Sequence, residues 1–238
     1  AFCFPDTYEI GMSHLGMKIL YGAINAQPDM LCERVFMPWV DMKALMEEQN
    51  VLDKITIAAW IITHPHGDHI GGLPYLLREF KAPVYGGRMT IELLGYKLND
   101  RVPGLTKACQ LHAVEAGQTI RCGCFSVEFI HVNHSIADAV AFAIHTPVGT
   151  VVMTGDFKID PTATDGMIDL ARFGELGNQG VLALLADSTN VERAGYTPSE
   201  NTVAEGLDRQ FKNCDQRIIV TTFASNMHRI QAVLATAQ

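Results

Sequence analysis

The chain has 238 residues, of which 48% are hydrophobic, so it is long and apolar enough to fold into one large globular domain or two small ones. It contains no apolar run of membrane-spanning length and no basic start followed by an apolar segment, and we therefore expect a soluble, cytoplasmic protein without a membrane partner. The formal net charge of −8 argues against non-specific coating of nucleic acid, but it is compatible with a local basic groove or with bound metal ions.

Residues 1–50 differ in pattern from the rest of the chain. Apolar residues at helical spacing predict a helix over residues 11–26, which Pro28 ends. Asp41 is a suitable N-cap for a second helix over residues 41–49.

Two strings in this opening segment, Phe4–Gly16 and Glu33–Trp39, resemble the N-terminal, cobalamin-binding-like part of a family of radical S-adenosylmethionine proteins. The resemblance implies that residues 1–50 are a separate segment, in which His14 is either an ordinary helix residue or a cobalt ligand. It does not imply radical chemistry, because the chain lacks the Cys-x-x-x-Cys-x-x-Cys that holds the iron–sulfur cluster in that family.

From about Ile55 onward, apolar strands alternate with helices. This alternation predicts an α/β protein with a mixed sheet and with functional residues at the ends of its strands. The expected strands cover residues 55–63, 83–85, 125–132, 139–145, 150–154, 181–186 and 217–222, and the expected helices cover residues 72–80, 90–98, 163–176, 199–212 and 227–237.

The most informative string is His64-Pro65-His66-Gly67-Asp68-His69, which follows the first of these strands. A lone histidine after a strand is usually a surface or supporting residue, but four metal-binding side chains within six positions favour a metal site. Gly67 supplies backbone freedom, so that the residues before and after it can face two adjacent metals. Such a pair of metals indicates metal-assisted hydrolysis.

Three further polar residues, His134, Asp156 and Asp187, each follow a predicted strand. Loops at one edge of a sheet converge in space, so we expect these residues to meet the histidine cluster. An ordinary strand-end cap is the alternative for Asp187, while His131 is expected to be a core or supporting residue because it lies on the opposite strand face.

The histidine cluster, the later histidine and the later aspartate together resemble the metallo-β-lactamase fold, an αββα sandwich. The resemblance implies two divalent metals, zinc by preference with manganese or magnesium as alternatives. It assigns His64, His66 and His134 to one metal, assigns Asp68 and His69 to the other, and places Asp156 as a bridge between the two.

More specific strings resemble ribonuclease J, a family of the β-CASP branch of this fold, over about residues 53–238. That family cleaves RNA internally and degrades it from the 5′ end, so the resemblance implies phosphodiester hydrolysis with RNA as the partner, and it allows a homo-oligomer. The strings are Glu128–Ala139, His145–Thr150, Thr154–Lys158, Asp187–Asn190 and Thr222–Arg229.

The same resemblance implies roles for further residues. Asp68, Asp156 and Asp187 are the expected catalytic carboxylates. The entry to the inserted β-CASP domain is expected to face the RNA backbone through Ser225, Asn226, His228 and Arg229. For Ser225 and Asn226, helix capping is an equally good interpretation.

The expected organisation is an N-terminal segment over residues 1–50, a metallo-β-lactamase-like domain over residues 51–222 and the start of a β-CASP domain over residues 223–238. We expect the sandwich to be incomplete, because its opening strands and most of the β-CASP domain are missing, and activity of this chain is therefore in question. The alternatives are another hydrolase of the same fold, acting on a thioester or a lactam, and a non-catalytic fusion fragment.

Overall fold

The structure is a computed structural model that describes residues 2–7, 34–37, 57–160, 162–163, 165–189 and 191–237. Within the opening segment, β1 (Phe2–Thr7) and β2 (Arg34–Met37) form a parallel two-stranded sheet. The two helices expected over residues 11–26 and 41–49, and His14, lie outside the described residues.

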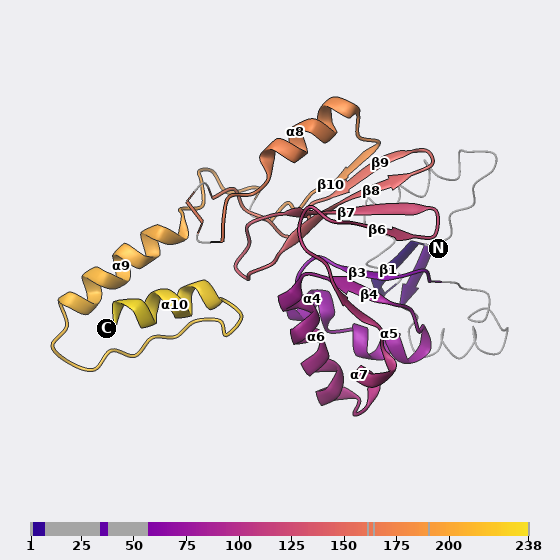
Figure 1. The fold of residues 1–238 in the computed structure, drawn as a ribbon. Coiled ribbons are helices and arrows are strands. Elements are labelled where there is room, and N and C mark those ends of the chain that lie inside the picture. Colours follow the sequence, from indigo (N-terminus) through magenta and orange to yellow (C-terminus); the bar gives the residue numbers. More distant parts are fainter. Residues whose placement is uncertain are drawn as a thin grey trace.

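Two larger sheets face one another in the centre of the molecule (Figure 1). The smaller is parallel, in the order β3-β4-β5, and the larger is mixed, in the order β10-β9-β8-β7-β6, with only β9 and β10 parallel. Their bounds are β3 (Trp60–Ile62), β4 (Val84–Gly86), β5 (Leu111–Ala113), β6 (Thr119–Cys122), β7 (Phe125–His131), β8 (Val140–Thr146), β9 (Gly149–Met153) and β10 (Ala183–Leu185).

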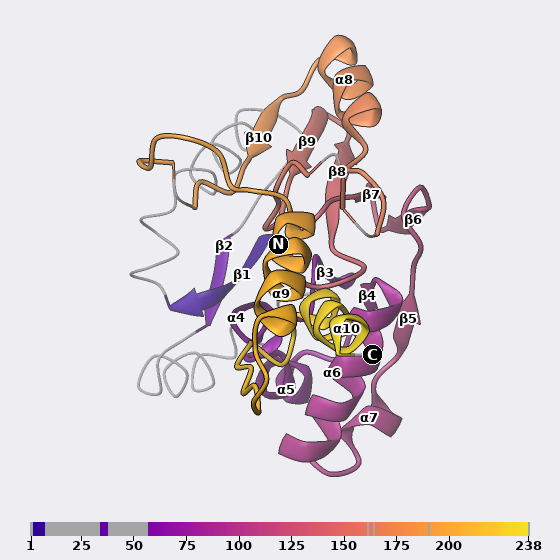
Figure 2. The ribbon, with the colours of Figure 1, turned by 90° about the vertical axis from the view of Figure 1, so that its left-hand side faces the viewer.

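Helices cover the outer faces of both sheets. Figure 1 shows α4 to α7 against the smaller sheet and α8 against the larger one, while Figure 2 shows α9 and α10 beside each other at one side of the sandwich. Their bounds are α4 (Gly67–Ile70), α5 (Leu73–Glu79), α6 (Arg88–Arg101), α7 (Leu105–Ala108), α8 (Leu170–Gln179), α9 (Glu200–Lys212) and α10 (Met227–Thr236). No helix in the described ranges is both long enough and apolar enough to span a membrane.

The alternation of side chains along β7 explains why the sheets stack in layers. Phe129 faces the smaller sheet. It packs edge-to-face on Phe142 of the neighbouring strand β8, with ring centroids 5.0 Å apart, and joins a buried cluster that Ile61 and Tyr85 of the smaller sheet contact. The next residue, Ile130, faces the other way and packs in the core beneath α8. The result is the αββα sandwich expected from the sequence.

Several expected elements differ from the structure. Residues 217–222 do not form a strand: Ile219 is 83% exposed, and this segment pairs with no strand among the described residues. The helix expected from residue 163 begins only at Leu170, because Asp169 caps it by accepting a hydrogen bond from the Arg172 amide. The short elements α4, α7, β5 and β6 were not expected, since four residues or fewer carry little periodicity.

Candidate metal centre

The candidate site lies where the smaller sheet meets the larger one. His64 and His66 follow β3, and His69 lies in the short helix α4. His134 comes from the loop after β7, and Asp156 from the loop after β9. Their ligand atoms form two groups, each spanning less than 4.8 Å, namely His64–His66–His134 and His64–His69–Asp156.

His64 is fully buried, and its two ring nitrogens have different surroundings. Nδ1 lies 3.1 Å from the Thr63 hydroxyl, whereas Nε2 has no hydrogen-bond partner within the described part of the chain. Burial, with help from neighbouring His69 and His134, lowers the pKa of His64 to about 3. The ring is therefore neutral at physiological pH, and a proton on Nδ1 leaves the Nε2 lone pair directed into the site.

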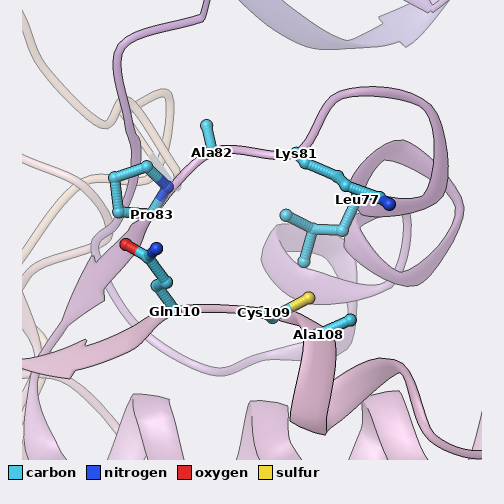
Figure 3. Close-up of a pocket in the computed structure, with 7 residues that line it drawn as sticks. All are labelled: Leu77, Lys81, Ala82, Pro83, Ala108, Cys109 and Gln110. Carbon is cyan, nitrogen blue, oxygen red and sulfur yellow. The ribbon is translucent and has the colours of Figure 1, made fainter.

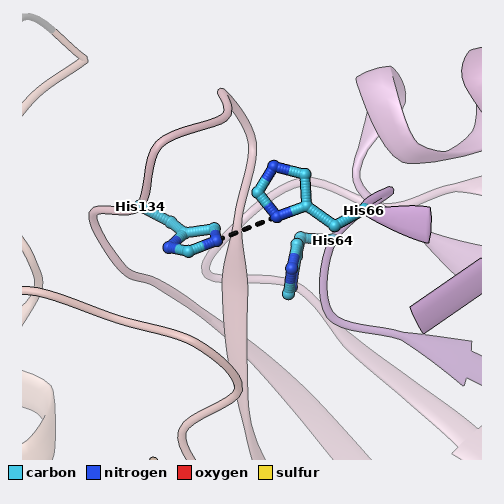
Figure 4. Close-up of side chains that lie close together, drawn as sticks. All are labelled: His64, His66 and His134. Carbon is cyan, nitrogen blue, oxygen red and sulfur yellow. Dashed lines mark hydrogen bonds between the residues drawn. The ribbon is translucent and has the colours of Figure 1, made fainter. Parts of the chain in front are cut away.

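His66 and His134 bring two ring nitrogens together across the site (Figure 4). His66 Nδ1 and His134 Nε2 are 3.0 Å apart, and burial lowers the pKa of His134. Two nitrogens bound to one tetrahedral zinc at about 2.0–2.1 Å lie about 3.3 Å apart. The spacing of these rings is therefore close to that of two ligands on one metal.

Asp156 stands between the two groups. Its Oδ2 lies 3.8 Å from Nε2 of both His64 and His134, and its Oδ1 lies 3.4 Å from His69 Nε2. Interaction with His69, followed by the charges of the other histidines, lowers the pKa of Asp156 to about 2. An ionised carboxylate with one oxygen toward each group has the chemistry of a bridging ligand.

The two remaining residues of the cluster are less enclosed. Burial lowers the pKa of His69, but the hydrogen bond and charge of Asp156 outweigh it, with smaller contributions from Asp68 and Asp187, so the net shift is upward. Asp68 Oδ2 lies 3.5 Å from His69 Nε2, yet the Asp68 side chain is 77% exposed and belongs to neither group of converging ligand atoms. The structure thus gathers five of the six predicted metal ligands and leaves Asp68 at the rim.

Asp187 lies beside the site and also shapes its own loop. Its negative charge makes a small contribution that raises the pKa of His69 and opposes the lowering of the pKa of His134. Its Oδ1 accepts hydrogen bonds from the amide and hydroxyl of Thr189, and its amide donates to the Thr154 hydroxyl. The turn-capping role and the position beside the site therefore coexist.

The residues expected to face RNA lie at the start of α10, where they contact other parts of the chain. Asn226 is buried and caps the helix by accepting a hydrogen bond from the Arg229 amide, which is the capping interpretation. Arg229 donates to both carboxylate oxygens of Glu200, and His228 Nε2 lies 3.7 Å from Asp165 Oδ2. Ser225 is partly buried in the turn before the helix. Their contact with RNA stays a prediction.

Sequence reasoning missed the residues that support the ligands. Gly155, next to Asp156, has a φ of +58°, and a Cβ there would lie 2.9 Å from Thr63 Cγ2. Glycine is needed there, because only a residue without a side chain combines this backbone conformation with so close an approach. A glycine directly before a predicted ligand was the available signal.

A small cavity elsewhere in the fold is separate from this centre (Figure 3). It measures about 110 Å³ and is lined by residues that include Pro83 and Gln110, which precede β4 and β5. His64 and His66 follow the parallel strand β3, so the cavity lies at the opposite edge of the smaller sheet. It is not part of the metal centre.

Comparison with known proteins gives one family match and several relatives. The family model of the metallo-beta-lactamase superfamily matches residues 36–186. Ribonuclease J of Thermus thermophilus is 44% identical over 211 residues, covering 85% of this chain and 36% of that protein. Ribonuclease J2 of Bacillus subtilis is 37% identical over 217 residues, covering 91% of this chain and 38% of that protein. The chain thus spans about a third of the length of these relatives.

Among solved structures, a protein of unknown function from Enterococcus faecalis V583 matches with a TM-score of 0.58 at 21% identity, covering 74% of this chain and 44% of the other. That likeness shows the fold alone. None of these matches supports the resemblance of residues 1–50 to radical S-adenosylmethionine proteins, and the family match begins at residue 36.

Proposed function

This chain belongs to the metallo-β-lactamase superfamily, and from that membership we propose that it carries the catalytic centre of a metal-dependent ribonuclease of the ribonuclease J type. The observation that carries the proposal is the buried His64 Nε2, which faces converging ligand atoms and has no hydrogen-bond partner in the described residues. A buried polar atom without a hydrogen bond destabilises a fold unless a ligand completes it.

In the proposed site, His64, His66 and His134 would hold one divalent cation. His69 would hold a second, with Asp68 turning inward from the rim and Asp156 between the two cations. All three side chains of the first set are imidazoles, which bind metals in their neutral form, and zinc is the cation that such a set favours.

When bound, such a pair of cations lowers the pKa of a water and stabilises the negative charge that develops on phosphate oxygens. The protein supplies the rest. In the tautomer that carries its proton on Nδ1, the Thr63 hydroxyl would accept from Nδ1–H and fix the His64 ring, and the lowered pKa of Asp156 keeps its carboxylate ionised near pH 7. Asp187, whose loop is tied to Thr154, keeps a third carboxylate at the edge of the site.

RNA is proposed as the substrate because proteins named ribonuclease J are 37–46% identical to most of this chain. A polymer with a negative charge at every link also suits a site built for two dications, which can stabilise both the attacking and the leaving oxygen of a phosphodiester. The proposed setting is cytoplasmic RNA, and Ser225, Asn226, His228 and Arg229 remain the proposed contacts to its backbone.

The test is cleavage of a 5′-monophosphorylated RNA by the purified chain. We expect cleavage with zinc or manganese, loss of cleavage after chelation, and a rate at least about 100-fold lower for Asp156→Ala. Asp100→Ala removes an exposed carboxylate on α6 and is the matched control. A metal-loaded wild-type protein that leaves RNA intact but hydrolyses a thioester or lactam would overturn the choice of substrate.

A further inference from the structure

Asn133 directly precedes the predicted ligand His134 and is fully buried. Both the amide nitrogen and the amide oxygen of its side chain form hydrogen bonds. The amide nitrogen donates to Asp165 Oδ1 at 3.1 Å and to the Gly166 carbonyl at 2.6 Å, and Oδ1 accepts from the Ile168 amide at 3.0 Å. One side chain thus fastens the loop after β7 to the chain that leads into α8.

The backbone of the same residue reaches a second ligand-bearing loop. The Asn133 carbonyl accepts a hydrogen bond from the Lys158 amide at 2.8 Å, in an isolated antiparallel bridge. Lys158 is two residues after Asp156 in the chain. Asn133 therefore joins the loop that carries His134 to the loop that carries Asp156, and it anchors both to residues 165–168.

The proposed site requires a constant distance between these two loops, because each loop carries a ligand. His134 Nε2 and Asp156 Oδ2 lie 3.8 Å apart. Beyond the ends of β7 at His131 and β9 at Met153, the bridge between Asn133 and Lys158 joins the two loops directly. Groups outside the ligand set that fix ligand orientation contribute strongly to metal affinity.

We propose that Asn133 is a positioning residue, which sets the distance between His134 and Asp156 and thereby the geometry of metal binding. It does not touch the metal or the substrate. The inference rests on the proposed function only in assuming that the His134 and Asp156 side chains share a metal. The evidence for the role of Asn133 is its hydrogen bonds, since the side chain is uncharged.

The test uses two variants of the full chain. Asn133→Asp keeps the size of the side chain and the acceptor for Ile168, but it replaces the amide donor with an oxygen that faces the Asp165 carboxylate and the Gly166 carbonyl. Asn133→Ala removes all three bonds. We expect zinc affinity, measured by competition with a chelator, to fall by about 10- to 100-fold in both variants.

A rescue variant separates positioning from general destabilisation. Adding Asp165→Asn to Asn133→Asp gives a new amide donor opposite the new acceptor, so we expect at least a tenfold recovery of zinc affinity. Asp169→Ala removes the α8 cap, leaves the Asn133 bonds in place, and should lower stability without changing zinc affinity. The visible spectrum of the cobalt(II)-substituted protein, which reports ligand geometry, should change in Asn133→Asp and not in Asp169→Ala.

The outcomes distinguish the two proposals. Wild-type protein that binds zinc and leaves RNA intact overturns the ribonuclease function alone, whereas folded Asn133 variants with wild-type zinc affinity and an unchanged cobalt spectrum overturn the positioning role alone. Failure of the rescue variant to recover any affinity would also contradict the positioning role. Wild-type protein that takes up no divalent metal overturns both.

Discussion

At the scale of single residues, the centre is defined by ring nitrogens that face one another at close range. His66 Nδ1 and His134 Nε2 lie 3.0 Å apart, and the buried His64 Nε2 lies 3.8 Å from Asp156 Oδ2. Neutral imidazoles arranged in this way bind a divalent cation better than they bind one another.

His66→Ala tests the ligand set at this scale. We expect it to remove the zinc held by the three-histidine group and to lower RNA cleavage at least about 100-fold, because a supporting residue alone is worth about 10- to 100-fold. His112→Ala is the control, since that exposed ring only stacks on Tyr85 with centroids 4.9 Å apart. Equal zinc content in both variants would contradict the assignment.

The identity of the ligands is the part of the site that the sequence predicts best. His64, His66 and His69 occur in one short string, and His134 and Asp156 follow recognisable strands, so strand ends bring them together. Their binding of metal stays a prediction. A supporting residue such as Asn133 could not be predicted, because its role depends on contacts with residues 165–168, which are distant in the chain.

At the scale of elements, the end of β9 needs a backbone that turns sharply beneath β3. Placing an alanine in a left-handed backbone conformation costs roughly 1–2 kcal/mol. Gly155→Ala is expected to lower the free energy of unfolding by more than this, because the added Cβ would also approach Thr63 too closely. Zinc affinity should fall with it, since Asp156 is the next residue. Urea unfolding and chelator competition measure the two effects.

Gly117→Ala is the matched control for that variant. Gly117 has a φ of +87°, and a Cβ added there would have nothing within 4 Å. The substitution should show the backbone penalty alone and keep wild-type zinc affinity. Equal effects of the two substitutions would contradict a close approach at Gly155.

The buried carboxylate of Asp160, four residues after Asp156, accepts hydrogen bonds from Ser199 and Glu200 at the start of α9. Burial would raise the pKa of Asp160, but hydrogen bonds from Ser199, Thr162 and the Glu200 amide outweigh it and lower the pKa to about 2. The folded state therefore favours the ionised form, which stabilises the protein above pH 4 and is lost as the pH falls toward 2.

Asp160→Asn should consequently reduce the free energy of unfolding of the metal-free protein by on the order of 2 kcal/mol at pH 7. The difference from wild type should shrink between about pH 4 and pH 2, as urea unfolding at several pH values would show. Asp208→Asn, which breaks an exposed pair with Lys212 on α9, should have an effect below about 1 kcal/mol. A difference that stays constant down to pH 2 would be inconsistent with the lowered pKa.

Most elements longer than four residues were predicted from the sequence, whereas the short elements α4, α7, β5 and β6 were not. The strands β7 and β8 match the expected ranges within one or two residues, because both faces of each are buried. Residues 217–222 have the composition of a strand but find no partner strand in the described structure. Strand formation depends on pairing, which composition alone does not encode.

At the scale of the whole molecule, the two sheets are held together by one apolar layer. Phe129 lies at its centre with no exposed surface. Phe129→Ala should cost about 3–5 kcal/mol in the free energy of unfolding, through lost burial and the cavity left behind. Tyr96→Ala, at a side chain 76% exposed on α6, should cost far less. Similar losses in a urea titration would contradict the layered core.

The α/β class follows from the order of predicted elements, and the sandwich follows from the resemblance to the metallo-β-lactamase fold, but neither explains the relation of residues 1–50 to the rest. The expected resemblance of that opening segment to another family rests on two short strings and is not supported, and the metallo-beta-lactamase family match, which begins at residue 36, overlaps the second string. Short strings reflect local similarity, while the layered core depends on contacts such as those of Ile61 and Tyr85 with the cluster around Phe129, which join the two sheets.

The most direct measurement is the zinc content of the purified wild-type chain, determined by elemental analysis alongside His134→Ala. We expect at least one zinc per wild-type chain and a clear loss in the variant, with the first set of three histidines responsible for the difference. Wild-type protein that is folded and yet contains essentially no zinc, manganese or other divalent metal after reconstitution would contradict the metal centre.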